Sequence, residues 1–305
     1  MTATILSENT IPGLPSASGV EIVGDTAFVI GDDSPFLYRL DAATLAPTGR
    51  IALFETAEFG TGRIRKRDKP DLEALAALRW PDGRVGLLLL GSGSQPNRAR
   101  GWFVPTEVPQ PIPEILNLAP LYALLQGLLP PEVVLNLEAA ATSATELLLF
   151  QRTVGRADAV LLFRLPLAAT LGWLSGAAGA AAPAAQQLRF QLPAIDGCPA
   201  GFSGATFVDD QLFVTASVED TADAVLDGRV LGSFIGLVSL AAQTATFARL
   251  AWADGRAYFG KVEGLAVRRS VGNGRWELLL VTDDDTGGST AVVAEVAVET
   301  EAVGN

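Results

Sequence analysis

The sequence predicts an all-β fold, a five-bladed β-propeller in which a single domain spans residues 1–305. The first observation is an internal repeat of five similar units. The second is that each unit contains short apolar runs separated by turn residues, a pattern typical of antiparallel strands. The third is a spare apolar segment before the first unit, which is suited to closing a ring of blades.

Each unit opens with one polar residue that follows an apolar residue and precedes small or apolar ones. This opening predicts the innermost strand of a blade, the strand that lines the central channel. Successive openings are separated by 55, 65, 65 and 60 residues. The five opening residues are Ser18, Glu73, Glu138, Ser203 and Glu263.

Further apolar runs predict that each blade has four strands. Second strands are expected at residues 28–33, 88–94, 148–152, 213–217 and 280–285; third strands at 36–40, 99–104, 159–165, 234–240 and 291–298; fourth strands at 50–54, 113–118, 188–192 and 245–252. The last unit has no fourth run, so residues 3–11 are expected to supply it and to join both termini in one blade. A sandwich or another all-β fold with coincidental similarity is the alternative.

Two insertions interrupt the repeat. Residues 120–131 have helical content and lie between the second and third units. Residues 166–187 are rich in alanine and glycine and predict a loosely helical loop between the third and fourth strands of the third blade.

Strand direction predicts which polar residues meet at one mouth of the channel. Because neighbouring strands alternate in direction, the segment entering the inner strand and the segment leaving the second strand lie on the same face. We expect this face to be the functional one. The residues placed there are Asp32, Asp33, Lys69, Asp71, Ser92, Ser94, Asn97, Arg98, Gln151, Arg152, Glu219, Asp220, Lys261 and Asp283, Asp284 and Asp285.

The five opening residues form the predicted metal site. Three carboxylates in one narrow channel repel one another unless a cation, shared protons or partner lysines are present. Calcium takes 6–8 oxygen ligands, so a ring of Ser18, Glu73, Glu138, Ser203 and Glu263 suits Ca²⁺, with Mg²⁺ or Mn²⁺ as alternatives. The competing interpretation is that backbone N–H groups and channel water satisfy the carboxylates.

The cations of the same face suggest an anionic ligand. All three lysines of the chain, Lys66, Lys69 and Lys261, precede inner strands. This concentration in a chain of net charge −12 suggests a small, phosphate-bearing ligand held by Lys69, Arg98, Arg152 and Lys261, with Ser92 and Glu219 beside them. A solvated basic loop that balances neighbouring acids is the alternative.

Composition excludes several classes of function. The net charge argues against nucleic acid as a partner. The absence of histidine excludes a Ser-His-Asp triad, a Cys-His pair and histidine-ligated zinc or iron. One cysteine, Cys198, allows no intramolecular disulfide, and the first ten residues lack the features of a signal peptide, so we expect a cytoplasmic location. No apolar run is long enough for a membrane span.

The order Ser, Glu, Glu, Ser, Glu at the inner-strand starts resembles the calcium-activated apyrases, the soluble calcium-activated nucleotidases. Residues 69–75, 201–207 and 261–265 are similar to that family's second, fourth and fifth repeats. The resemblance implies a five-bladed propeller with calcium in the channel, held by the five opening residues. Similar inner-strand strings occur in phytase-like and lactonase-like propellers, and the whole chain also resembles a group of bacterial propeller proteins with no assigned activity.

Three functions remain open at this point. The first is a calcium-dependent hydrolase of a phosphate ester or anhydride, in which Asp32, Asp33 and Asp283, Asp284 and Asp285 orient water or hold a second cation. The second is a non-enzymatic binding module in which the calcium is structural. The third is a sugar-active enzyme, which would need two carboxylates facing an open cleft.

Overall fold

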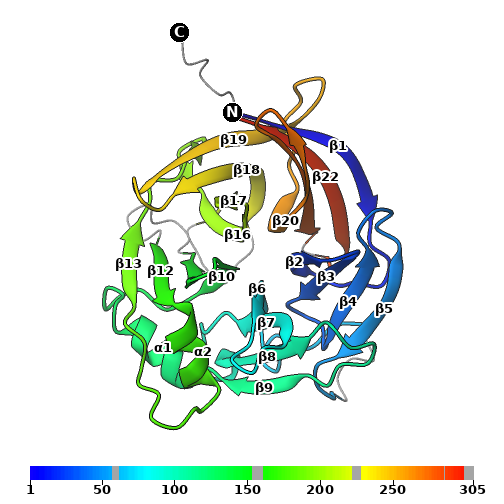
Figure 1. The fold of residues 1–305 in the computed structure, drawn as a ribbon. Helices are drawn as coiled ribbons and strands as arrows, with labels where there is room; N and C mark the ends of the chain where they lie inside the picture. The colour runs from blue at the N-terminus through cyan, green and yellow to red at the C-terminus, as the bar shows by residue number, and fades with distance from the viewer. Residues whose placement is uncertain (57–61, 153–160, 222–227, 285, 299–305) are drawn as a thin grey trace.

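The strands are arranged as sheets in a ring around a central axis in the computed structural model (Figure 1). The structure describes residues 1–56, 62–152, 161–221, 228–284 and 286–298. Within these ranges the chain is mainly β-structure with two short α-helices. The expectation of an all-β, propeller-like fold is confirmed.

Three sheets each contain four antiparallel strands in sequence order, as the repeat predicts. The first sheet contains β2 (Ala17–Val23), β3 (Thr26–Gly31), β4 (Phe36–Asp41) and β5 (Pro47–Ala52). The second contains β6 (Leu72–Arg79), β7 (Val85–Gly91), β8 (Arg100–Pro105) and β9 (Glu114–Asn117). The third contains β10 (Leu137–Thr142), β11 (Glu146–Gln151), β12 (Leu161–Pro166) and β13 (Gln186–Arg189).

The remaining long strands form one eight-stranded sheet in the order β16-β17-β18-β19-β1-β22-β21-β20. One half contains β16 (Gly201–Val208), β17 (Gln211–Asp220), β18 (Arg229–Ser239) and β19 (Thr244–Trp252). The other half contains β20 (Lys261–Gly272), β21 (Arg275–Asp283), β22 (Ser289–Ala297) and the N-terminal β1 (Thr2–Thr10).

The N-terminal strand joins the two halves. β1 pairs antiparallel with β22, so the start of the chain supplies the fourth strand beside the last three, as the sequence predicts. It also pairs parallel with β19 through Ala3, Thr4 and Ile5, which the sequence did not predict. An exposed outer strand offers free backbone N–H and C=O groups, and here the neighbouring edge strand takes them.

Several strand limits differ from the expected ones. β17 and β18 are longer than residues 213–217 and 234–240, because they continue to pair with each other out to Asp220 and Arg229, past the residues that pair with β16 and β19. β5 and β13 begin earlier and end earlier than predicted. A small extra hairpin, β14 (Ala194–Ile195) with β15 (Cys198–Pro199), was not predicted. Residues 159 and 160 of the expected third strand lie outside the described residues.

Both insertions contain a helix of eight residues. α1 (Ala119–Gln126) buries Leu121, Tyr122 and Leu125 against the core between the second and third sheets. α2 (Leu167–Leu174) occupies the start of the alanine-rich segment. In the described part of the chain, no helix has the length and apolar character that crossing a membrane requires.

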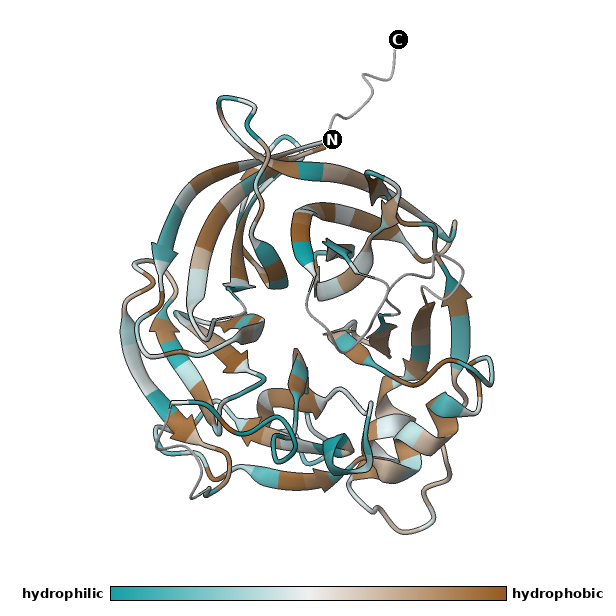
Figure 2. Cartoon of the chain, turned by 180° about the vertical axis from the view of Figure 1, so that it is seen from behind, coloured by the Kyte–Doolittle hydropathy of each residue, from teal (hydrophilic) through white to brown (hydrophobic). Residues whose placement is uncertain are grey.

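Apolar side chains fill the spaces between neighbouring sheets. The outermost strands carry alternating hydrophobic and hydrophilic bands in Figure 2, as expected for strands with one buried face. Near the axis the backbones approach closely. A Cβ atom on Gly264 would lie 2.8 Å from the Cα of Gly19, and a Cβ atom on Gly204 would lie 2.9 Å from the Cα of Gly264. Glycine therefore allows three inner strands to meet at the centre.

Candidate functional site in the central channel

The inner strands converge on one small cavity. Its walls come from β2, β6, β10, β16 and β20. The cavity has a volume of about 10 Å³, about the room that one water-sized sphere occupies. Its polar lining is provided by Ser18, Glu73, Glu138 and Glu263. The site therefore has space for one ion or one water and none for an organic ligand.

A β-bulge aims each opening residue. In all five inner strands the pairing register with the second strand shifts at the same repeat position. The extra residue of a bulge leaves the ladder, which redirects its side chain. The bulged residues are Ser18, Glu73, Glu138, Ser203 and Glu263. The equivalence of these residues, predicted from the repeat, thus has a backbone cause that the sequence did not show.

Ser203 does not reach the cavity. Its fully buried hydroxyl lies 3.2 Å from the hydroxyl of Thr215 and 3.3 Å from that of Ser217. Gly204 and Ala205 line the cavity at this position instead. Ser18 does reach it, and its hydroxyl donates to the carbonyl of Leu72 at 2.5 Å. The structure therefore brings four of the five predicted metal ligands to the cavity.

Glu73 is the most isolated carboxylate of the ring. Within the described ranges its side chain has no hydrogen bond or ion pair. Burial raises its pKa well above the usual value, and the neighbouring carboxylates of Asp71 and Glu138 raise it further. Burial and these carboxylates therefore oppose the ionised form of Glu73.

Glu138 and Glu263 have partial partners. Asn136 donates to Glu138 at 2.5 Å and Arg152 lies 3.4 Å from its other oxygen, yet burial raises the pKa of Glu138 to about 7. One oxygen of Glu263 lies 3.2 Å from the Lys261 ammonium and 3.6 Å from Arg152. Its second oxygen, Oε2, is buried and has no hydrogen-bond partner in the described structure. An orphaned carboxylate oxygen beside an ion-sized cavity is a ready ligand for a cation.

Arg152 and Lys261 each form ion pairs with carboxylates of the channel. Both lie near Glu219, with Arg152 Nη2 at 3.1 Å and Lys261 Nζ at 3.3 Å from Glu219 Oε1. Burial opposes ionisation of Glu219, but the two cations lower its pKa overall. The Arg152 and Lys261 side chains are only 8% and 12% exposed. These cations neutralise the ring and offer little surface to an external anion.

Lys69 and Arg98 also form ion pairs with carboxylates. The Lys69 ammonium contacts Asp32, lies 3.0 Å from Asp71 and lies 3.4 Å from Asp33. Although burial alone would lower the pKa of Lys69, these carboxylates raise it. Arg98 donates to Asp71 at 2.7 Å. All four cations predicted to hold a phosphate therefore already contact carboxylates.

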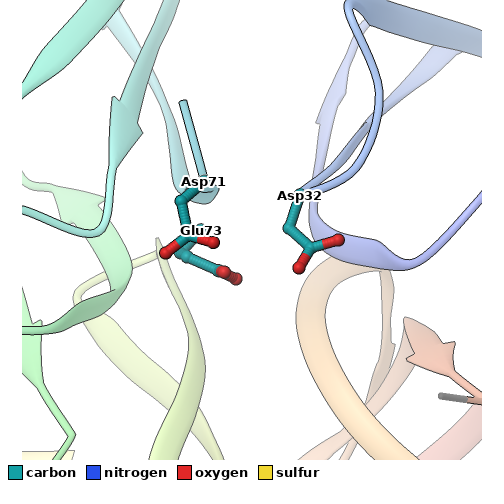
Figure 3. Close-up of side chains that lie close together, drawn as sticks. All are labelled: Asp32, Asp71 and Glu73. Atoms are coloured by element: carbon teal, nitrogen blue, oxygen red, sulfur yellow. The ribbon is translucent and has the colours of Figure 1, made fainter. Parts of the chain in front are cut away.

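A second acidic group lies at the mouth of the channel. Asp32, Asp71 and Glu73 have carboxylate oxygens within 4.8 Å of one another. Figure 3 shows Asp71 and Glu73 on one side and Asp32 facing them from the neighbouring sheet. Asp71 adopts a left-handed φ of 56°, and its carboxylate accepts hydrogen bonds from Ser92 and Arg98. The sequence placed Asp71 on this face without a role; the signal it offered was its position two residues before Glu73.

Asp32 and Asp33 differ in environment. Burial raises the pKa of Asp32 to about 6, against the opposing effect of Lys69. One of its oxygens, Oδ1, is buried and has no hydrogen-bond partner in the described structure. Asp33 is buried and accepts a hydrogen bond from Arg63 Nε at 2.6 Å. Of this pair, Asp32 is therefore the better candidate for proton transfer.

The acidic run after β21 is less suited to catalysis than the sequence suggested. Asp284 accepts hydrogen bonds from the backbone of Thr286 and Gly288, so its carboxylate stabilises its own loop. Asp283 ends β21 and pairs in register with Lys261. Asp285 lies outside the described residues.

Comparison with known proteins identifies the family of this chain. A model described as a family of unknown function, DUF6929, matches residues 13–296. The chain belongs to this family. No curated protein matches this DUF6929 member.

Solved structures resemble the fold of this DUF6929 chain at low sequence identity. The Myxococcus xanthus glutaminyl cyclase is 13% identical, with 98% of each chain covered and a TM-score of 0.50. The Malassezia sympodialis allergen Mala s 1 is 9% identical, with 94% of this chain and 95% of that chain covered and a TM-score of 0.50. The Swd1 β-propeller domain of Myceliophteria thermophila is 9% identical, with 95% and 99% covered and a TM-score of 0.42. These likenesses concern the fold alone.

Proposed function

We propose that this DUF6929 chain is a five-bladed propeller whose channel binds one divalent cation, and that it acts as a binding module. The blade count rests on five antiparallel units, because the eight-stranded sheet separates at the parallel β1–β19 pair into two units of four strands. The five bulges at equivalent positions support the same count.

The observation that carries the cation proposal is the cavity itself. Glu73, Glu138 and Glu263 enter it from three different strands, and Glu263 Oε2 has no hydrogen-bond partner in the described structure. Arg152 and Lys261 compensate Glu138, Glu219 and Glu263, whereas Glu73 has no direct cationic partner in the described structure. A bound cation would stabilise the ionised form of Glu73 and supply a partner for Glu263.

Calcium is the best chemical match. The donors are carboxylate and hydroxyl oxygens, which suit hard cations, and the site contains no nitrogen or sulfur ligand among its described lining residues. Calcium accepts irregular sets of oxygens, whereas magnesium demands near-octahedral geometry. Glu73, Glu138, Glu263 and Ser18 would hold the ion, with Mg²⁺ and Mn²⁺ as the alternatives to test.

A binding module is favoured over a hydrolase because of the cations at the rim. Lys69, Arg98, Arg152 and Lys261 are each about nine-tenths buried and contact carboxylates. A phosphate would have to displace those carboxylates before it could use them. In the binding-module proposal the cation is structural and the rim recognises a protein partner rather than a small anion.

A calcium-dependent hydrolase of phosphate esters or anhydrides is the second candidate. The observation in its favour is Asp32, whose pKa of about 6 and orphaned oxygen suit a proton-transferring group near neutral pH. In this proposal Lys69 would neutralise developing negative charge beside it.

Calorimetric titration of the chelator-treated protein with Ca²⁺, Mg²⁺ and Mn²⁺ tests the cation site. We expect one Ca²⁺ per chain, a rise in Tm on binding, and proton release in weakly buffered solution, because a cation favours the ionised form of the buried carboxylates. Glu263→Gln should weaken Ca²⁺ binding at least about tenfold, whereas the exposed Glu55→Gln should not. Absence of saturable binding of any of the three ions would contradict the proposal.

An assay of phosphate release from a panel of nucleotides, with and without Ca²⁺, separates the two functions. Turnover that disappears in Asp32→Asn while Ca²⁺ binding is retained would favour the hydrolase. Ca²⁺ binding without turnover on any member of the panel would favour the binding module.

A further inference from the structure

A second hollow lies at the end of the propeller away from the ring. It is a groove of about 620 Å³ between the first sheet and the last strands of the chain. β2 and β20 begin beside the ring and run away from it, so the turns that follow them lie at the opposite end. The charged lining of the groove consists of Asp25, Asp41, Arg268, Arg269 and Glu277, and Ile22 is its largest apolar side chain. It shares no residue with the channel cavity.

Arg268 fixes one wall of this groove. Its Nε and Nη2 atoms donate to the carbonyl of Ala42 at 3.2 and 2.9 Å, and Nη2 also donates to the carbonyl of Ala43 at 2.8 Å. Its Nη1 donates to Glu277 at 2.5 Å. These bonds tie β20 to the turn after β4, so the groove is formed before any ligand arrives. The same bonds occupy Arg268 and leave it little capacity for a ligand.

Three other charged groups are available. Asp25 is exposed, and within the described residues its carboxylate has no hydrogen bond or ion pair. The Arg269 side chain is 67% exposed and donates to Glu277 through Nη2 alone among the described contacts. Asp41 uses Oδ1 to accept from Ala43 and Thr44, and no described group donates to its Oδ2. The lining thus combines the carboxylates of Asp25 and Asp41, the exposed guanidinium of Arg269 and apolar side chains such as Ile22.

We propose that this groove binds a small zwitterion, an amino acid or a short peptide, with its ammonium group at Asp25 and Asp41 and its carboxylate at Arg269. Guanidinium–carboxylate pairing is geometrically specific and stronger than a neutral hydrogen bond. The volume lies in the range of about 300–1,000 Å³ that is usual for small-molecule sites. A polyamine has no carboxylate to pair with Arg269, and an inorganic phosphate has no ammonium group to pair with Asp25 and Asp41.

The test is a titration of the full chain with small-molecule probes, in which binding is measured by calorimetry or ligand-observed NMR. The zwitterionic probes are glycine, L-glutamate, L-arginine and diglycine, and the comparators are acetate, spermidine and inorganic phosphate. We expect at least one zwitterion to bind with a Kd of about 1 mM or tighter. Asp25→Asn and Arg269→Gln should each weaken that binding at least about tenfold, because each removes one charged contact.

Two matched variants serve as controls. Asp209→Asn and Arg256→Gln make the same changes at exposed positions in other turns and should leave binding unchanged. All four variants concern exposed side chains, so each should keep the Tm of the parent chain within about 2 °C. Binding of no zwitterion, binding of spermidine or phosphate alone, or zwitterion binding that both groove variants retain would each overturn the proposal. Loss of channel Ca²⁺ binding does not bear on it, since the two sites share no residue.

Discussion

Arg152 is the cation on which the channel carboxylates depend most. Its guanidinium lies 3.1 Å from Glu219, 3.4 Å from Glu138 and 3.6 Å from Glu263, and its side chain is 8% exposed. Arg152→Met keeps most of the apolar stem and removes the charge. After this change Lys261 remains as a partner of Glu219 and Glu263, while Glu138 loses its direct ion pair.

The expected destabilisation follows from leaving buried carboxylates unpaired. Removing one partner of a buried ion pair typically costs about 3–5 kcal/mol, because the remaining charge stays desolvated. For a chain of this size a change of 1 kcal/mol corresponds to about 2 °C in Tm, so the variant should unfold about 6–10 °C lower at pH 8. The deficit should shrink toward pH 4.5, because the protonated carboxyl groups no longer need a cation.

Thermal unfolding followed by circular dichroism, with a chelator present, measures this effect. Arg256→Met is the matched control, since Arg256 is 74% exposed and its partner Asp254 is 54% exposed. Exposed pairs contribute less than about 1 kcal/mol, so this control should shift Tm by no more than about 2 °C. If Arg152→Met and Arg256→Met behaved alike at pH 8, the inference that Arg152 neutralises a buried carboxylate ring would be refuted.

Two further predictions concern the same channel. Burial raises the pKa of Glu138 from 4.5 to about 7, so the folded chain holds a proton between these pH values that the unfolded chain has lost. The Glu138 contribution to stability should therefore fall by about 3 kcal/mol as pH rises from 4.5 to 7 in the presence of a chelator. Glu138→Gln should remove that share of the slope in urea unfolding, while Glu21 and Asp32, whose pKa values burial also raises, keep theirs. Gly264→Ala should cost about 1–3 kcal/mol, measured in the same way, because the new Cβ would lie 2.8 Å from the Cα of Gly19.

Each of these predictions has a control in the chain. Glu55→Gln changes an exposed carboxylate and should leave the pH slope intact. Gly172→Ala adds a Cβ in α2 where, apart from its chain neighbours and the backbone of its own helix, no atom lies within 4 Å, and alanine favours helix, so stability should stay equal or rise. A pH slope that Glu138→Gln leaves unchanged, or a Gly264→Ala variant as stable as Gly172→Ala, would contradict the packing and burial described above.

The repeat in the sequence predicted the sheets well because strands leave a local signal. Apolar runs and turn residues gave the order of strands and the partner of the N-terminal segment, which pairs with β22. The parallel pairing of β1 with β19 could not be predicted, since it depends on how two outer edges meet in space. The long β17 and β18 strands were missed for a similar reason: each is extended by pairing with the other.

The candidate site was predicted in part. Repeat spacing identified Glu73, Glu138 and Glu263 as neighbours, and all three line one cavity. The sequence could not show that the Ser203 hydroxyl points away from the cavity, toward the hydroxyls of Thr215 and Ser217. It also could not show that Lys69, Arg98, Arg152 and Lys261 form ion pairs with carboxylates, because the pairing of long side chains depends on distances between neighbouring sheets.

The sequence by itself determined that this chain is all-β and repetitive, that it contains no histidine, and that equivalent polar residues open its inner strands. These properties follow from local periodicity and composition, which need no knowledge of distant contacts. Only the tertiary structure decided that a bulge aims each opening residue, that the cations of the channel are neutralised within it, and that a mixed-charge groove exists at the other end. The physical reason is that burial and ion pairing are properties of segments far apart in the chain, brought together when the sheets close around the axis.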